Sequence, residues 1–442
     1  PPERSIAVLA FENMSDDAEQ EYFSDGLSEE ILNLLAQIKS LKVIARTSSF
    51  LFKNKDVDVA TMAAQLNVRH ILEGSVRRSG NRIRITAQLI DAADSTHIWS
   101  QTYDRELDDV FAVQDEIAAA ISDALKVQLE LVEGEPLLPL AIRTASIDAY
   151  DSYLLGRELI RQRGGTNVRN AIRHLERSLR LDELFAPAHV QLAVGAMLLA
   201  SYGTVADQEA RQTINRHMGR AEELEPDLAE IQGVRALLVS VIDGDHEATI
   251  EHARQALASN PNYPDAMNWL TGSLGALGRY EEAEEAGRQL LELDPLSIIG
   301  RVNYGGSLLG KGRTEEAHEL AEELLVQSPR WGYRLHGDAS FREGKLAESL
   351  SWYLRSNPGG FFAGLIFSFV GEHDEARRVN EYLSDYIDFI QRRYDDAIRV
   401  AERNLQLNPD SYDAIETSAD FRYFAGRIDE ALPFYERMLD LA

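Results

Sequence analysis

A glycine-rich segment near residue 305 is the first place where residue types suggest chemistry. The run Gly305-Gly-Ser-Leu-Leu-Gly-Lys311-Gly312 resembles the loop that wraps nucleotide phosphates, in which a lysine reaches the phosphates and a following Ser or Thr holds magnesium. Gly312 stands where that Ser or Thr is needed, and the segment lies inside a predicted helix with no strand before it. We therefore predict that this segment binds no phosphate.

Histidines and acids are present but lack the spacing of a metal site or a catalytic site. His246 and His252 are six residues apart, off a single helical face, and the His-Glu-x-x-His pattern does not occur. The chain contains no cysteine and no Gly-x-Ser-x-Gly elbow, which excludes thiolate ligands, cysteine nucleophiles and that serine-hydrolase signature. A group of loop acids lacks the glycine turn and alternating oxygen ligands of a calcium loop: Asp16, Asp17, Glu19 and Glu21.

These observations predict no catalytic residue, no metal and no cofactor. An enzyme whose site is assembled only in three dimensions remains an alternative.

Four arginines gather around a predicted hairpin turn: Arg77, Arg78, Arg82 and Arg84. One interpretation is an edge strand that charge protects from pairing with other chains. The other is a contact with an acidic partner surface, which could belong to this chain's own carboxy-terminal part.

Residues 1–132 alternate between strand-like and helix-like segments. Apolar runs, period-two alternation and helical spacing predict the order β-α-β-α-β-β-β-α. The elements are a strand at 5–11, a helix opening at 26–30 with Ser28 as N-cap, a strand at 41–45, a helix at 58–67, a hairpin of 68–76 and 82–90, a strand at 96–103 and a helix at 110–129. This order predicts an α/β domain in which helices cover a layered sheet.

Two prolines and a glycine then predict a linker at 133–147. Beyond it, glycines followed by acids and alanine recur every 34 residues at Gly244, Gly278 and Gly312. Prolines keep step with them at Pro261, Pro295 and Pro329. A fixed period of this length indicates helix pairs that stack into a superhelix, because one pair cannot bury its apolar stripe alone. We expect about eight pairs over residues 148–442, irregular around 359–393.

The period and the alternation of large and small residues resemble tetratricopeptide repeats, most closely over residues 227–329. Small or apolar residues occupy the packing positions of that family at Gly156, Ala171, Ala256, Leu270, Ala283, Gly305 and Ala317. The resemblance implies a concave groove lined by the first helix of each pair. It places ten residues there as candidates for binding a protein or peptide: Tyr153, Arg157, Arg161, Asn268, Trp331, Arg334, Asp338, Asp413, Glu416 and Asp420. The Lys/Asn/Arg carboxylate clamp of some family members is absent.

The first 130 residues resemble a second family, the TolB amino-terminal-like (FlgO-like) domain. The resemblance rests on several segments together: Ile6–Asn13, Glu21–Glu30, Ala45–Phe50, Leu72–Arg77, Arg84–Ile90, Tyr103–Asp109 and Val113–Ile117. It departs from the family at Ala10, where proline is usual. The resemblance implies a bacterial protein in which this domain lies between a membrane-anchored regulatory head and the repeats. Such heads include adenylate/guanylate cyclases and winged-helix DNA-binding domains, and neither is found in these residues.

Charge limits the partners of this region. A formal charge of −28 disfavours binding to nucleic acid or to anionic lipid, both of which need a basic face. The chain begins at Pro1 without methionine, so we expect a fragment of a longer, membrane-anchored protein. We expect this part to lie on the periplasmic side, with the cytoplasm as the alternative, and a homodimer is allowed.

The sequence thus favours a non-catalytic protein-binding scaffold or sensor. A structural envelope or flagellar assembly factor and an enzyme with an unrecognised site are the alternatives.

Overall fold

A computed structural model describes most of the chain. The described residues are 1–17, 20–38, 40–129, 144, 146–202, 204–226, 228–357, 362–363, 366–367, 375–376, 378, 394–407, 412–425 and 427–441. They divide into two compact units, Pro1–Gly310 and Lys311–Ala442. The predicted linker at 133–147 and the irregular segment at 359–393 lie almost entirely outside the described residues.

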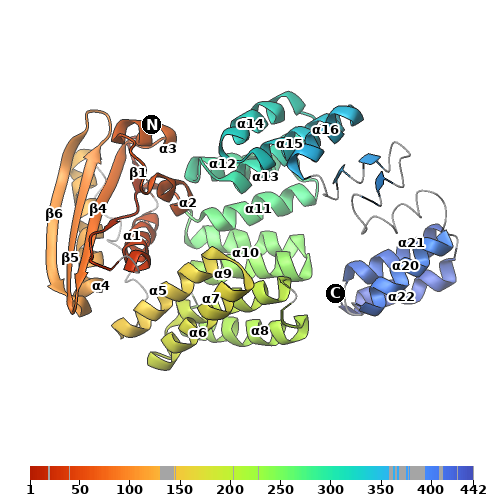
Figure 1. The fold of residues 1–442 in the computed structure, drawn as a ribbon, viewed down its shortest axis with the longest axis horizontal. Helices are drawn as coiled ribbons and strands as arrows, with labels where there is room; N and C mark the ends of the chain where they lie inside the picture. Colours follow the sequence, from red (N-terminus) through yellow and green to blue (C-terminus); the bar gives the residue numbers. More distant parts are fainter. Residues whose placement is uncertain are drawn as a thin grey trace. The chain divides into compact units, whose positions relative to one another are not determined.

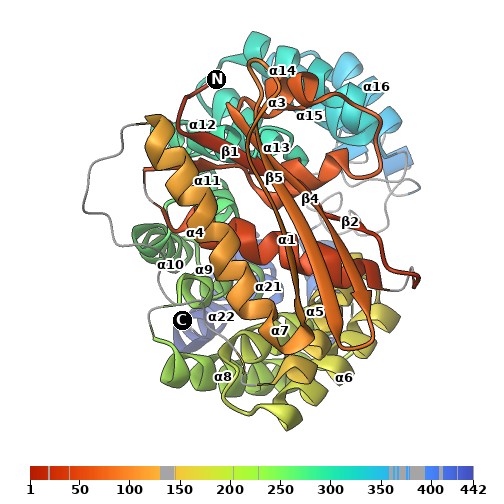
Figure 2. The same cartoon turned by 90° about the vertical axis from the view of Figure 1, so that its left-hand side faces the viewer.

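The amino-terminal part of the first unit is a mixed sheet with helices (Figures 1 and 2). Its strands run in the order β3-β1-β4-β5-β6, and β2 pairs with β4. β1 is parallel to β3 and β4, whereas β4, β5 and β6 are antiparallel. The strands are β1 (Ser5–Val8), β2 (Glu12–Asn13), β3 (Lys42–Val43), β4 (His70–Ser79), β5 (Arg82–Asp91) and β6 (Thr96–Glu106). The helices are α1 (Glu21–Ala36), α2 (Arg46–Ser49), α3 (Val59–Leu66) and α4 (Val110–Leu129).

The period-two alternation of the strands decides which residues reach each side of the sheet. Leu72 of β4 joins Ile83 and Ile85 of β5 in one core, which α1 and α4 cover. Its neighbour Ile71 belongs to a second core with Leu66 of α3. Successive side chains of a strand point to opposite faces, so the one strand serves both cores. The predicted α/β domain is confirmed.

Several predicted boundaries of this domain are wrong. The strand predicted at 5–11 ends at Val8, and α1 begins at Glu21. Ser28 is therefore no N-cap: it lies inside α1, where its hydroxyl donates to Ser24 O and accepts from the Phe11 amide, each at 2.9 Å. A polar side chain paired in this way satisfies a buried backbone group and does not start a helix.

Antiparallel helix pairs follow, as predicted. The first unit contains α5 (Ile147–Gln162), α6 (Gly165–Leu181), α7 (Ala186–Ser201), α8 (Asp207–Leu224), α9 (Ala229–Leu238), α10 (His246–Ser259), α11 (Pro264–Ala276), α12 (Tyr280–Leu293) and α13 (Ile298–Gly310). The second contains α14 (Thr314–Gln327), α15 (Pro329–Arg342), α16 (Leu346–Ser356), α20 (Tyr394–Leu407), α21 (Tyr412–Phe424) and α22 (Ile428–Leu441).

The periodic glycines and small residues have the expected physical roles. Gly244, Gly278 and Gly312 have φ values of +66°, +73° and +76°, a left-handed conformation that favours glycine and ends each helix. The predicted packing residues are buried, with Ala171, Ala256, Ala283 and Ala317 fully enclosed. Gly305–Gly310 of the glycine-rich run lie in α13, as the prediction of a repeat helix required, while Lys311 and Gly312 form the turn that follows it.

Candidate functional site

Helix α1 of the α/β domain lies along α5, the first repeat helix (Figure 1). The Tyr22 hydroxyl donates to Asp151 at 2.9 Å. One turn further, the Cα of Gly26 is so near Leu154 that a Cβ at residue 26 would lie 2.7 Å from a Leu154 methyl carbon. A side chain at residue 26 would require the Leu154 side chain to shift, so glycine lets the two helices approach closely here.

Further along α1, two adjacent glutamates meet the arginines of α5. Arg157 Nη1 lies 2.8 Å from Glu30 Oε1, and Arg157 Nη2 lies 3.4 Å from Glu29 Oε2. Glu29 also pairs with Arg161 Nη2 and, at 3.1 Å, with Arg46 Nε of α2. Glu29 and Arg157 are only 8% and 4% exposed, so the ion pairs are largely shielded from water. We call this set, with Tyr22–Asp151 and Gly26–Leu154, the α5 contact.

The charges of the α5 contact shift the acidities of its members. Burial raises the pKa of Glu29, but Arg157, Arg161 and Arg46 outweigh burial and bring that pKa down to about 2. Burial raises the pKa of Glu30, which has Arg157 as its main opposing charge. Burial and the nearby Glu30 raise the pKa of Glu230, at the start of α9, to about 7. The α5 contact therefore lowers the pKa of one carboxyl, Glu29, and lies beside carboxyls whose pKa values burial raises.

A second contact joins the α/β domain to the turns that follow α10 and α12. The Asn262 side-chain amide donates to Ala36 O at 2.9 Å and to Leu41 O at 3.1 Å. The Ala45 amide donates to Leu293 O at 2.8 Å. This pairing satisfies buried backbone groups on both sides.

Ser48 completes this second contact. Its hydroxyl donates to Asp294 and accepts from the Leu296 amide, the latter at 2.9 Å. Burial raises the pKa of Asp294 to about 6, although Ser48 opposes that shift. Leu296 also packs on the core that contains Ile44. We call these residues, with Asn262, Ala36, Leu41, Ala45 and Leu293, the turn contact.

The predicted groove residues of the first unit fall into two places. Tyr153, Arg157 and Arg161 come together on α5, where Tyr153 is buried and the two arginines meet α1. The two arginines are therefore engaged by a helix of the same chain, and Tyr153 packs edge-on against Phe185 with ring centroids 5.0 Å apart. Asn268 lies apart from them on α11, where it accepts from the Asn303 side chain of α13 at 2.9 Å.

The candidates of the second unit lie on two helices. On α15, Arg334 Nε lies 3.0 Å from Asp338, and its guanidinium lies 3.6 Å above the Phe362 ring. Asp338 also accepts from the Tyr353 hydroxyl at 2.6 Å, and Trp331 is half-buried on the same helix. On α21, Asp420 accepts from Tyr435 at 2.7 Å. Asp413 and Glu416 belong to α21, but their side chains lie outside the described residues.

The arginines of the hairpin have several partners. The edge-strand interpretation is wrong, because β4 and β5 lie inside the sheet and β6 forms its edge. Arg82 and Arg84 pair with Asp104 of β6, and Arg77 donates to Met14 O at 3.0 Å. Arg78 lies 3.1 Å from Asp151 of α5, so one arginine does contact an acidic residue of the chain's own repeats.

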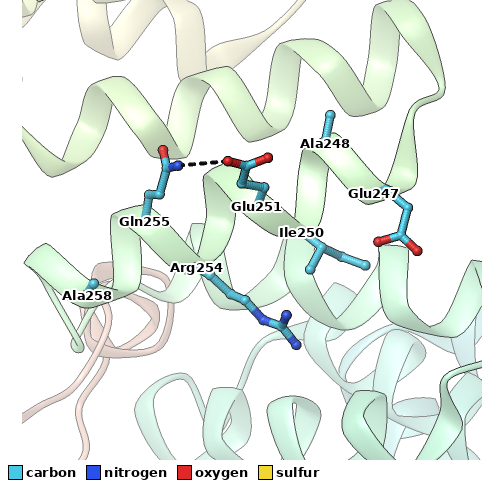
Figure 3. A pocket seen from close by; sticks show the side chains of 7 residues that line it. All are labelled: Glu247, Ala248, Ile250, Glu251, Arg254, Gln255 and Ala258. Carbon is cyan, nitrogen blue, oxygen red and sulfur yellow. Dashed lines mark hydrogen bonds between the residues drawn. The ribbon is translucent and has the colours of Figure 1, made fainter.

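The described residues offer little for other ligands. They contain no group of three or more His, Cys, Asp or Glu placed to hold a metal ion. A surface hollow runs along α10, and Figure 3 shows that all its lining residues come from this one helix. Its only bond between drawn residues joins Gln255 to Glu251 at 3.3 Å. None of the predicted groove residues lines it.

The sequence predicts Arg157 and Arg161 as site residues but not their partners Glu29 and Glu30. It predicts no residue of the turn contact, including Ser48, Asn262 and Asp294. The usable signal was the pair of adjacent acids in the middle of an apolar helix, which requires buried cations nearby.

Two family models match separate parts of the chain. Residues 2–120 match the family model described as "HilA/YgeH-like transcriptional regulator, second domain", and residues 241–299 match a tetratricopeptide repeat model. The amino-terminal part is thus similar to a HilA-like regulator domain, and a later part is similar to tetratricopeptide repeats.

Two curated relatives share parts of the sequence. The protein named "Putative adenylate cyclase 3" from Rhizobium meliloti (strain 1021) is 40% identical over 242 residues, which are 54% of this chain and 40% of that protein. A small glutamine-rich tetratricopeptide repeat-containing protein 2 from Mycosarcoma maydis is 38% identical over 77 residues, 17% of this chain and 22% of that protein. The chain therefore spans less than half the length of either relative.

Two solved structures match parts of the chain at low identity and with TM-scores below 0.5. A tetratricopeptide repeat protein from Parabacteroides merdae has a TM-score of 0.38 at 16% identity, covering 65% of this chain and 99% of its own. The type IV pilus biogenesis factor PilW has a TM-score of 0.42 at 15% identity, covering 50% of this chain and all of its own. Among the described residues, no helix has the length and apolar character that crossing a membrane requires.

Proposed function

We propose that this chain is a non-catalytic, protein-binding part of a longer bacterial regulatory protein. The repeats bind a protein partner, and the α/β domain packs against the repeats and forms one functional unit with them. We further propose that the α/β domain is TolB amino-terminal-like. The whole protein would be anchored in a membrane, with this part on the periplasmic side. A regulatory head of the cyclase or winged-helix type would then receive the signal.

The observation that carries the proposal is the α5 contact. There a repeat helix already binds a helix, through Tyr22–Asp151, a close approach at Gly26 and the pairing of Glu30 with Arg157. Repeats of this family generally hold other polypeptides. The name of one relative, a putative adenylate cyclase, and the description of the matching family as a transcriptional regulator both favour a regulatory role for the whole protein.

The second unit supplies the surface that we assign to the partner. Trp331 and Arg334 lie on α15, and aromatic and arginine side chains are the residue types that most often anchor protein interfaces. Asp338 holds Arg334 in place at 3.0 Å, so the arginine is oriented before a partner arrives.

Site-specific crosslinking in the full-length protein tests this function. A photoreactive residue at position 331 should capture one defined protein, and Arg334→Glu should weaken that capture at least ~10-fold, as expected for an interface anchor. Arg288→Glu is the matched control, because Arg288 lies on the exposed face of α12 and forms ion pairs with Glu285 and Glu292 of its own helix. Capture that is equal in Arg334→Glu and Arg288→Glu would reject this surface.

The alternative of an unrecognised enzyme has its own test. Purified chain is screened for hydrolase and transferase turnover, and each activity is repeated with single substitutions. A turnover that one substitution abolishes without unfolding the protein would contradict the non-catalytic assignment.

A further inference from the structure

The α/β domain holds the repeats at two separate places, and α1 links them. Its first three turns supply Tyr22, Gly26, Glu29 and Glu30 to the α5 contact, and its last residue, Ala36, supplies a carbonyl to the turn contact. Gly26 and Ala36 are ten positions apart, a separation of about 15 Å at the rise of an α-helix. The two contacts are therefore joined by one rigid element and not by a flexible loop.

The repeat helices reach from one contact to the other by a longer route. The first helices of successive pairs pack in series, α5 on α7, α7 on α9, α9 on α11 and α11 on α13. In such an array each pair contacts mainly its neighbours, so small rotations at every joint add up to a change of curvature. The α/β domain contacts both α5 and the turn between α12 and α13, and it thereby bypasses these joints.

We propose that the α/β domain is a brace that fixes the curvature of helices α5–α13. Both contacts suit this role. The α5 contact is ionic and largely buried, while the turn contact is made of directional hydrogen bonds to backbone atoms. If α5 moved as a rigid body relative to the turns that follow α10 and α12, the α5 contact or the turn contact would break.

The brace goes beyond the proposed function, because it concerns the shape of the array and needs no partner to be present. It also states how regulation would operate. A ligand changes the balance between braced and released arrays only by the difference in its affinity for the two states. A partner that favours the released array would free the α/β domain.

Distance measurement tests the brace directly. The chain has no cysteine, so Gln162→Cys at the end of α5 and Ile299→Cys on α13 can carry spin labels without other changes. Both positions are exposed. The intact chain should give one narrow distance distribution between these labels. Glu29→Gln with Glu30→Gln, or Asn262→Ala with Ser48→Ala, should each broaden or shift it.

Hydrogen exchange at the contact left intact provides the second readout. Cutting the α5 contact should speed exchange of the Ala45 and Leu296 amides at least ~10-fold, because a released domain opens both contacts together. Glu285→Gln, in an exposed pair on α12, is the control and should change neither readout. An unchanged distance distribution together with unchanged amide exchange would overturn the brace.

These measurements use the purified chain alone. A failure to find a partner therefore leaves them unaffected, and a failure of the brace leaves the crosslinking test intact. Far-UV circular dichroism identifies variants that have lost helix. If the Asn262→Ala, Ser48→Ala double variant has lost helix, the single substitution Asn262→Ala is used in its place.

Discussion

Arg157 Nη1 lies 2.8 Å from Glu30 Oε1, although 127 residues separate the two in sequence. One belongs to the first repeat helix and the other to the first helix of the α/β domain. Arg157 is 4% exposed, and a guanidinium removed from water in this way needs carboxylate partners to offset its desolvation. The pair therefore ties the orientation of α1 to the first repeat.

Removing the Glu29 charge should destabilise the first unit. In Glu29→Gln the arginines 46, 157 and 161 keep their charges but lose their shared carboxylate. We expect the free energy of unfolding to fall by ~3 kcal/mol, the usual cost of breaking a buried ion pair from one side. Urea titration of the full chain near pH 7 measures this change.

An exposed ion pair provides the matched comparison for that variant. Glu285 pairs with Arg288 on the surface of α12, with both side chains about half exposed. Glu285→Gln should therefore cost less than ~0.5 kcal/mol. Equal losses in the two variants would show that the α5 contact has no special weight.

Acid should selectively remove the contribution of Glu29. Its pKa falls from 4.5 to about 2 on folding, so the stabilisation is complete above pH 4.5 and disappears as the pH falls from 4.5 towards 2. The difference in unfolding free energy between wild type and Glu29→Gln should shrink over that window. A difference that stays constant between pH 2 and pH 7 would contradict the assigned ion pairs.

Glu230 should respond to pH with the opposite sign. Its pKa rises from 4.5 to about 7 on folding, so the folded chain loses stability as the pH rises between these values. Glu230→Gln removes that loss, and we expect it to be more stable than wild type by roughly 1–3 kcal/mol at pH 8. Thermal unfolding at pH 4 and pH 8 measures the effect, and a destabilised variant at pH 8 would refute it.

Gly74 of β4 should not tolerate a side chain. A Cβ there would lie 2.4 Å from the Thr86 carbonyl oxygen and 2.8 Å from the Phe11 ring, and the backbone of β5 cannot move aside without breaking the ladder. We expect Gly74→Ala to cost at least ~2 kcal/mol, in the range of overpacked cores.

Gly80→Ala is the comparison for Gly74→Ala, since its added Cβ meets no atom within 4 Å. It has a φ of +56°, so alanine there suffers only the backbone strain of ~1 kcal/mol. Denaturant midpoints of the two variants separate steric overlap from backbone strain, and a larger loss in Gly80→Ala would contradict the packing around Gly74.

The fold could be predicted where it depends on interactions between residues that are close in sequence. The 34-residue spacing of Gly244, Gly278 and Gly312 works because each turn needs a left-handed residue, and that need arises within a few residues of chain. The alternation from Ile83 to Leu89 placed one face of β5 in the core for the same kind of reason. The start of α1 was missed because a non-local partner, the Phe11 amide, binds the Ser28 hydroxyl that resembled a helix cap.

The sequence alone determined the repeat period, the alternating strands, the absence of cysteine and the acidic charge, because each follows from residue type and spacing along the chain. Only the tertiary structure decided that Arg157 and Arg161 pair with a helix of the same chain, and that Asn262 and Ser48 complete a second contact. These pairings join residues more than 100 positions apart, and no periodic pattern encodes the order in which rigid elements meet.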